Sequence, residues 1–171
     1  GTKIVKLINL SIKSMKVPDL ESAVPEEGAV ILTECDNEAQ EYKFVIDKIN
    51  EADVPKEQIF ILSRTNRQLE DTSEQLKLKG ISHIIKSEDA NEAVKPGHVI
   101  LATVHAIKGM EADVVFVIGC DNFPCKASDH PVVDLVKKID YDKDEEERRL
   151  FYVALSRARK QLFLTYTGTL T

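Results

Sequence analysis

The sequence predicts an α/β fold in which helices cover both faces of a parallel sheet. Short apolar runs recur along the chain, and amphipathic stretches with helical spacing separate several of them. A run that is apolar throughout is typical of a strand buried on both faces, as in a parallel sheet between helices. The chain has 171 residues, of which 43% are hydrophobic and 30% charged, as expected for one globular domain with a substantial core.

The domain is expected to occupy residues 28–171. Residues 1–27 contain one candidate strand, KIVKLINL, followed by a stretch rich in Pro, Glu and Ser that has the composition of a linker. The chain begins with Gly1 and Thr2 rather than with Met, which suggests a processed or excised piece of a longer protein.

The first strand and the first helix of the domain are predicted at residues 28–33 and 36–53. GAVILT is apolar between a glycine and a polar stretch, as expected for a strand buried on both faces. Asp36 and Asn37 are candidate N-caps, because their side-chain oxygens can accept from the first backbone N–H groups of the helix. The apolar side chains at helical spacing are Ala39, Tyr42, Val45, Ile46 and Ile49.

The remaining elements continue this alternation. Further apolar runs predict strands at residues 58–63, 82–86, 98–104, 113–119 and 161–166. Helices are predicted at residues 66–79, where Gly80 ends the helix, and at residues 144–158. The polar stretch 120–143 predicts a loop, with one helical turn at 131–138.

Charge and composition exclude several classes of protein. The net charge of −6 argues against a surface that coats nucleic acid by charge alone, so such binding would need a local patch. No apolar run is long enough for a membrane span, and no signal-peptide pattern occurs. The cysteine usage favours a reducing, intracellular setting, and a cytoplasmic, nucleoid-associated location is expected. Cys35, Cys120 and Cys125 cannot all pair internally. Their spacing with His130 matches no zinc pattern, so no metal site is predicted.

Three polar segments are candidates for chemistry, because working loops leave the C-terminal ends of strands in such sheets. In the first segment Arg64 directly follows the strand at 58–63, where its planar, permanently charged guanidinium suits a phosphate. A solvated turn arginine, with Asn66 capping the next helix, would produce the same sequence.

The second segment, TVHAIKGME, lies between two predicted strands and suits an anionic ligand. Gly109 permits close approach, Lys108 brings positive charge, and Thr103 can donate to a phosphate oxygen. Glu111 would repel phosphate, so its expected partner is a sugar hydroxyl, a cation or an arginine. His105 taken alone is also consistent with an ordinary polar loop residue.

The third segment is EEERRLFYVALSRARKQLFLTY, residues 145–166. Its basic side chains are Arg148, Arg149, Arg157, Arg159 and Lys160. Glutamates at the start of a helix and arginines toward its end complement the helix dipole. That explanation does not account for Arg157 and Arg159, which lie where the helix is expected to meet a strand.

These three segments, in this order, resemble motifs of the C-terminal RecA-like domain of UvrD-like (superfamily 1) DNA helicases. IFILSRTNRQ resembles motif IV, TVHAIKGMEADVVFVIG resembles motif V, and the segment 145–166, with VALSRA at its centre, resembles motif VI. The resemblance covers residues 28–166. It implies a RecA-like sheet that lacks its own P-loop, since G-x-x-x-x-G-K-[ST] occurs nowhere in the chain.

The resemblance also implies how the site works, because two RecA-like domains sandwich ATP in that family. ATP and Mg²⁺ are then held mainly by an N-terminal RecA-like domain of the same protein, while Arg157 and Arg64 reach the γ-phosphate as arginine fingers. The residues implied to face the nucleotide are Glu111, Gly109 and Lys108, and those implied to contact single-stranded DNA are Thr103 and His105.

The sequence departs from the family pattern at several places. Ser63 stands where many members carry an aromatic residue that can stack on adenine, and Ser156 replaces the commoner threonine. The short interval 86–97 stands where many members carry a large inserted domain, and an L-x-x-N-Y-R-S element is not recognisable in residues 1–27. A non-catalytic RecA-like module that binds nucleic acid or protein is the alternative function. In either case the chain alone is expected to show negligible ATPase activity.

Overall fold

The computed structural model describes residues 28–87, 94–107, 109–122 and 143–168. The predicted N-terminal segment 1–27, Lys108 and the turn predicted at 131–138 lie outside these residues.

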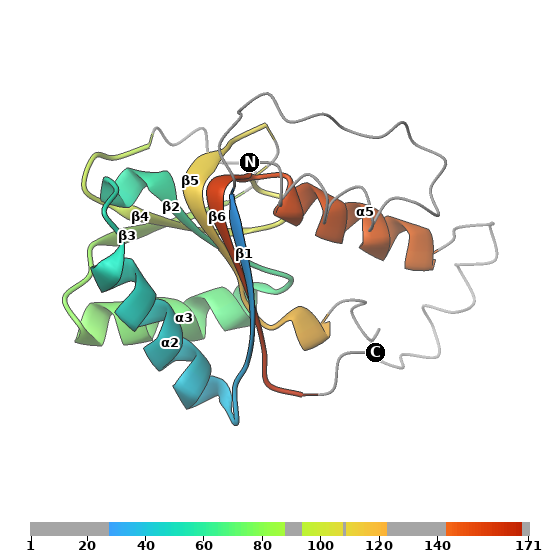
Figure 1. Cartoon of the computed structure of the whole chain (residues 1–171), viewed down its shortest axis with the longest axis horizontal. Helices are drawn as coiled ribbons and strands as arrows, with labels where there is room; N and C mark the ends of the chain where they lie inside the picture. The colour runs from blue at the N-terminus through green and yellow to red at the C-terminus, as the bar shows by residue number, and fades with distance from the viewer. Residues whose placement is uncertain (1–27, 88–93, 108, 123–142, 169–171) are drawn as a thin grey trace.

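A single six-stranded sheet forms the centre of the described structure (Figure 1). All strand pairs are parallel, and the order across the sheet is β1-β6-β5-β2-β4-β3. The strands are β1 (Ala29–Glu34), β2 (Ile59–Ser63), β3 (His83–Lys86), β4 (Val99–Thr103), β5 (Ala112–Val117) and β6 (Ala158–Tyr166). The predicted α/β fold and its six strands are therefore confirmed.

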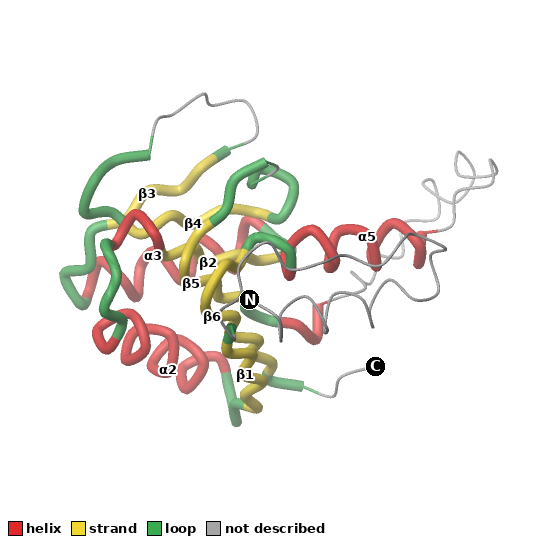
Figure 2. Tube along the Cα trace, turned by 45° about the horizontal axis from the view of Figure 1, so that its top comes forward, coloured by secondary structure: helices red, strands yellow, loops and turns green. Residues whose placement is uncertain are grey.

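Three helices cover the two faces of this sheet. The helices α2 (Glu38–Glu51) and α3 (Asn66–Leu78) lie on one side and α5 (Lys143–Leu155) on the other, as Figures 1 and 2 show. Two short 3₁₀ turns, η1 (Lys56–Gln58) and η2 (Cys120–Asn122), flank the strands. Within the described residues, no helix is both long enough and apolar enough to cross a membrane.

The helix starts follow from side-chain caps. Asn37 caps α2, as predicted, because its side-chain oxygen accepts from the backbone N–H of Gln40 at 2.9 Å. Asn66, the cap of this helix in the alternative explanation of Arg64, does not cap α3. Thr65 has the extended backbone that a cap requires and accepts from the N–H of Gln68, whereas Asn66 is already helical.

Alternating side chains of the strands form two separate cores. Ile61 of β2, Phe116 of β5 and Phe163 of β6 face α2 and α3, and the rings of Phe116 and Phe163 stack with centroids 4.8 Å apart. The neighbouring residues on the same strands, such as Leu62 and Leu162, face α5 on the other side. A strand with both faces buried is apolar throughout, which explains the continuous runs in the sequence.

One predicted burial and one predicted strand start differ from the structure. The strand at 28–33 was expected to be buried on both faces, but β1 is an edge strand that leaves Ile31 37% and Leu32 56% exposed. The last strand begins at Ala158 rather than at 161, because Ala158 already pairs with Ala112 of β5. As a result Arg159 belongs to a strand and not to the end of a helix.

Candidate functional site

Arg157 lies in the short connection between α5 and β6. Its Nε donates to Val153 O at 3.0 Å, its Nη1 to Met110 O at 3.2 Å and its Nη2 to Ser156 Oγ at 2.8 Å. Its own carbonyl accepts from Ala112 N at 3.0 Å. Arg157 therefore joins the end of α5 to the polar segment that precedes β5, and neutral oxygen atoms hold its half-buried guanidinium.

The polar segment 103–111 is anchored by two apolar side chains. Val104 and Ile107 are fully buried in the core that faces α5. Between them the backbone turns back on itself, since Ala106 N donates to Thr103 O at 3.1 Å and lies 3.3 Å from Thr103 Oγ1. The buried anchors fix the path of the segment, so the polar residues between and after them have defined positions.

The remaining polar residues of this segment lie closer to solvent. His105 is half-buried and Glu111 is exposed at the point where β5 begins. Gly109 has a φ of +79°, which is in the left-handed region, and a Cβ placed there would meet no atom within 4 Å. Glycine therefore serves the backbone conformation at this position, and the space beside it is open.

Arg64 directly follows β2 and is paired with Glu147 of α5. Its Nε lies 2.9 Å from Glu147 Oε2, and its Nη2 lies 2.5 Å from Oε1. The two side chains are 21% and 6% exposed, so the pair is largely withdrawn from water. The predicted solvated turn arginine is therefore ruled out, because Arg64 has a buried carboxylate as its partner.

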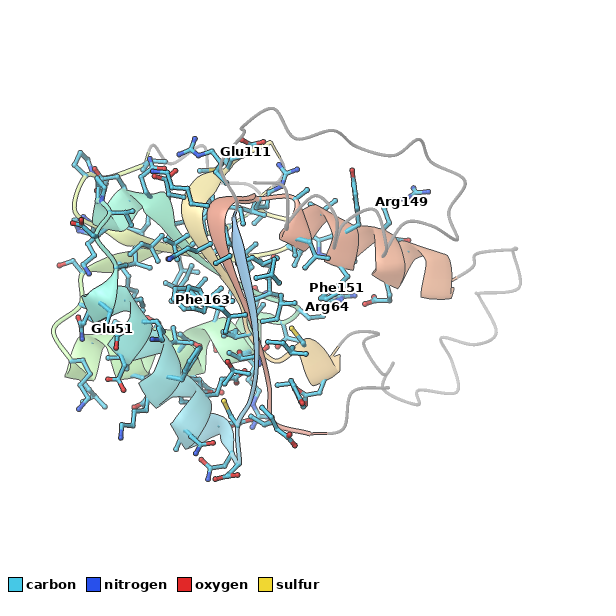
Figure 3. All side chains as sticks on the ribbon, in the orientation of Figure 1. Glu51, Arg64, Glu111, Arg149, Phe151 and Phe163 are labelled. Carbon is cyan, nitrogen blue, oxygen red and sulfur yellow. The ribbon has the colours of Figure 1, made fainter. Side chains whose placement is uncertain are left out.

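The candidate residues divide between the C-terminal ends and the N-terminal ends of the strands. Arg64 and Thr103 come at the C-terminal ends of β2 and β4, where the sequence predicted all three polar segments. That prediction is wrong for Arg157 and Glu111, which precede β6 and β5 and so lie at the opposite edge. Figure 3 shows Glu111 near the start of β6 and Arg64 beneath α5, further along the sheet.

Two of the remaining basic side chains in the third segment have an acidic partner. Asp113 lies 2.9 Å from Arg159 Nη2 and 2.9 Å from Lys160 Nζ, and Arg159 also donates to Gln58 Oε1. Burial tends to raise the pKa of Asp113, but hydrogen bonds from Lys160 and Arg159 outweigh it and lower that pKa below the usual value. These positive charges are thus used within the domain.

One buried acid was missed by the sequence reasoning. Glu41 of α2 is 1% exposed, and its Oε1 accepts from Gly119 N at 2.8 Å and from Thr165 Oγ1 at 2.5 Å. Burial raises the pKa of Glu41, and the two hydrogen bonds oppose this in part. The sequence feature that could have indicated the burial of Glu41 is its position four residues before Val45, on the apolar stripe of the helix. Ala39, which was predicted on that stripe, is exposed.

The family described as UvrD-like helicase C-terminal domain matches residues 83–169, about half of the chain. The chain belongs to this family. Relatives over a similar stretch include a probable DNA helicase II homolog of Mycoplasma capricolum, 44% identical over 82 residues, which are 47% of this chain and 10% of the relative. The ATP-dependent DNA helicase Rep of Buchnera aphidicola is 42% identical over 84 residues, 49% of this chain and 11% of that protein. The ATP-dependent DNA helicase PcrA of Staphylococcus epidermidis is 37% identical over 81 residues, 47% of this chain and 10% of that protein.

A solved structure has the same fold over the whole length of this helicase domain. The C-terminal domain of a possible DNA helicase from Lactobacillus plantarum superposes with a TM-score of 0.62 and 20% sequence identity, covering 100% of this chain and 88% of that one. The chain thus spans about a tenth of the full-length relatives that it matches, but nearly all of this isolated domain.

Two of the three cysteines of the helicase domain lie in its described core. Cys35 and Cys120 are buried free thiols, and burial raises the pKa of Cys120 to about 12. Cys125 and His130 lie outside the described residues. In the part of the chain that the structure describes, no group of three or more His, Cys, Asp or Glu residues could hold a metal ion.

Proposed function

We propose that this domain is the second motor domain of an ATP-dependent DNA helicase or translocase, in which Arg157 acts as an arginine finger. ATP would be held by an N-terminal RecA-like domain of the same protein. The observation that carries the proposal is the set of contacts around the guanidinium. Arg64 and Arg159 are each paired with a carboxylate, whereas Arg157 is held by neutral oxygen atoms. Its charge is therefore not compensated by an acid among the described residues, and it can act on an anion.

The energy needed to redirect Arg157 supports the same assignment. Contact with a phosphate would cost the hydrogen bond to Met110 O, and a neutral hydrogen bond contributes about 0.5–1.5 kcal/mol net. A charge-assisted bond to a phosphate oxygen is roughly twice as strong. Arg64 would instead have to leave a buried carboxylate, at a cost of about 3–5 kcal/mol. Arg157 is the better candidate, and the predicted finger role of Arg64 remains a prediction.

The charge that develops during phosphoryl transfer is the target of such a finger. The transferring γ-phosphoryl group spreads negative charge over its oxygens, and the fixed positive charge of Arg157 would stabilise that state. Arginine fingers contribute about 10³ to 10⁵ in kcat. The chain has no P-loop, so ATP and Mg²⁺ would be bound mainly by the N-terminal domain.

Residues near Arg157 are proposed to face the rest of the nucleotide. Glu111 is exposed directly after Met110, whose carbonyl accepts from Arg157. A carboxylate so close to a phosphate site suits a ribose hydroxyl rather than the phosphates. Gly109 leaves open space beside the backbone. Lys108, which also lies between β4 and β5 in the sequence, would add positive charge.

Contact with single-stranded DNA is proposed for Thr103 and His105. Thr103 lies at the sheet edge opposite to Arg157, which would keep the DNA contacts apart from the nucleotide. Binding through few phosphates gives a shallow salt dependence, with a slope of roughly −0.7 per phosphate for single strands. We expect the wild-type domain to bind an oligonucleotide weakly and Thr103→Ala to weaken that binding at every salt concentration without changing the slope, because a hydroxyl carries no charge, with the exposed Lys77→Ala as a control for folding. An affinity of Thr103→Ala equal to that of the wild type would contradict this assignment.

The proposal is tested by the ATPase activity of the purified 171-residue chain. We expect negligible hydrolysis, because the finger is present but the phosphate-binding loop is not. Robust hydrolysis that Arg157→Ala abolishes would contradict the proposal, since the chain would then be a complete enzyme. If Arg157→Ala leaves the ATPase activity unchanged, both in this chain and in a protein that joins it to a P-loop domain, the domain is a binding module instead.

A further inference from the structure

The hydroxyl of Ser156 lies against the guanidinium of Arg157, the next residue in the chain. Ser156 Oγ accepts from Arg157 Nη2 at 2.8 Å and lies 3.3 Å from its Nε, so it faces the edge of the guanidinium that these two nitrogens form. The same hydroxyl donates to Val153 O at 2.8 Å. Because a hydroxyl has a single hydrogen, this donation leaves its oxygen lone pairs for the N–H groups of Arg157.

The contacts of Arg157 leave two of its N–H groups without a partner among the described residues. A guanidinium has five N–H groups, one on Nε and two on each terminal nitrogen. Nε donates to Val153 O, Nη2 uses one hydrogen toward Ser156 Oγ, and Nη1 uses one toward Met110 O. One N–H on each terminal nitrogen therefore remains. The two terminal nitrogens form the end of the guanidinium fork, which can bind two oxygens of one phosphate.

Ser156 also completes the end of α5. The backbone N–H of Arg157 would continue the helix by donating to Val153 O, but it donates to Ala154 O at 3.2 Å instead. Two side chains replace it, because Val153 O accepts from Ser156 Oγ and from Arg157 Nε. If the guanidinium turns toward a phosphate, Val153 O keeps the Ser156 hydroxyl as its donor. The finger can therefore move without leaving this helix carbonyl unsatisfied.

We propose that Ser156 is a positioning residue, whose hydroxyl holds the edge formed by Nε and Nη2 and so directs the terminal nitrogens of Arg157 at the γ-phosphate. This inference rests on the proposed finger role of Arg157. Ser156 acts through the guanidinium and does not itself touch the nucleotide. A misplacement of a reacting group by about 1 Å can cost 10²-fold in rate. Loss of the hydroxyl should cost less than loss of the finger, because the positive charge of Arg157 stays.

The alternative is a purely structural role, in which the hydroxyl only caps the end of α5. Loss of the hydroxyl would then lower stability and leave the kinetics of the folded protein unchanged. Threonine and valine have nearly the same shape, and only threonine carries a hydroxyl. The variants Ser156→Thr and Ser156→Val therefore separate the effect of the hydroxyl from that of the size of the side chain.

The first measurement is ATPase kinetics in a protein that joins this chain to the proposed P-loop domain. Ser156→Ala and Ser156→Val are expected to lower kcat by about 10-fold to 10²-fold with KM for ATP little changed. Ser156→Thr is expected to retain most of the wild-type kcat, and Ser82→Ala, which removes an exposed hydroxyl, is the control. Urea unfolding shows that the variants are folded, because loss of one neutral hydrogen bond lowers the folding equilibrium constant by about 10-fold or less.

The second measurement places Ser156→Ala in the background of Arg157→Ala. If the hydroxyl acts through the guanidinium, it has nothing left to position, and the double variant has the kcat of Arg157→Ala alone. Losses that multiply would overturn the inference, because the two residues would then act independently. A wild-type kcat for Ser156→Ala, or a kcat of Ser156→Thr as low as that of Ser156→Val, would overturn it as well. These outcomes leave the proposed function intact, whereas a full kcat for Arg157→Ala overturns both.

Discussion

The buried carboxylate of Glu41 leads to a prediction about the pH dependence of stability. Its Oε1 accepts from Gly119 N and from Thr165 Oγ1, so it ties α2 to the ends of β5 and β6. Replacement by Ala leaves both buried donors unsatisfied, at about 1–3 kcal/mol for each. We therefore expect Glu41→Ala to lower the free energy of unfolding by about 2–6 kcal/mol. Glu41→Gln keeps an oxygen for both donors and is expected to cost less.

The Gln variant should gain on the wild type as the pH rises. Burial raises the folded-state pKa of Glu41 above its unfolded value, so the folded state binds more protons over the interval between the two values. The stability that this group contributes is complete below the unfolded pKa and is lost as the pH rises through the folded pKa. Gln does not titrate, and each unit of difference between the two pKa values is worth about 1.4 kcal/mol.

The assay is urea unfolding followed by circular dichroism, at several pH values between 4.5 and 8 for the wild type, Glu41→Gln and Glu41→Ala. Glu38→Gln is the matched control, since Glu38 lies on the same helix but is exposed. The difference between Glu41→Gln and the wild type should shift in favour of Gln with rising pH, while the control shows no such trend. A difference that is constant over this range, or that shifts toward the wild type, would refute the reasoning.

Three further substitutions test other parts of the structure. Asp113→Asn removes the partner of Arg159 and Lys160, and because these are 42% and 54% exposed we expect a loss of about 1 kcal/mol that 0.5 M salt largely removes. The lowered pKa of Asp113 means that this stabilisation is present above its unfolded pKa and disappears as the pH falls through the folded value, so acid titration of both proteins checks the sign. Gly109→Ala places a Cβ at a φ of +79° and should cost about 1–2 kcal/mol through backbone strain alone, and an unchanged melting temperature would contradict this. Phe163→Ala removes a ring stacked in the core and should cost about 3–5 kcal/mol by urea unfolding, whereas a loss below 1 kcal/mol would mean that this core collapses around the gap.

The strands of this fold could be predicted from local pattern because each is a continuous apolar run. The order of the strands could not, since nothing in GAVILT indicates that it forms an edge next to the last strand rather than a central strand. The end of α5 shows the same limit. Helical spacing continues to Ala158, but pairing of that residue with Ala112 of β5 ends the helix earlier. At both places the outcome depends on pairing with a strand that is distant in the sequence.

Candidate site residues could be selected from the sequence where they lie within a short segment, whereas contacts between distant residues could not be predicted. The polar residues of 103–111 and the arginine at 157 could be selected from sequence alone. The partner of Arg64 could not, because Glu147 belongs to a row of glutamates that all suit the start of a helix. The division of the candidates between the two ends of the strands follows from whether a residue precedes or follows its strand in a parallel sheet, and the prediction overlooked this for Glu111 and Arg157.

The most direct test of the proposed function is the kcat for ATP hydrolysis of Arg157→Ala, measured in a protein that joins this chain to the proposed P-loop domain. Arg149→Ala is the control, because Arg149 is exposed on α5 (Figure 3). We expect Arg157→Ala to lower kcat by about 10³-fold or more with KM for ATP little changed, while the control retains normal activity. A kcat within 10-fold of the wild type for Arg157→Ala would contradict the claim that this domain supplies the finger.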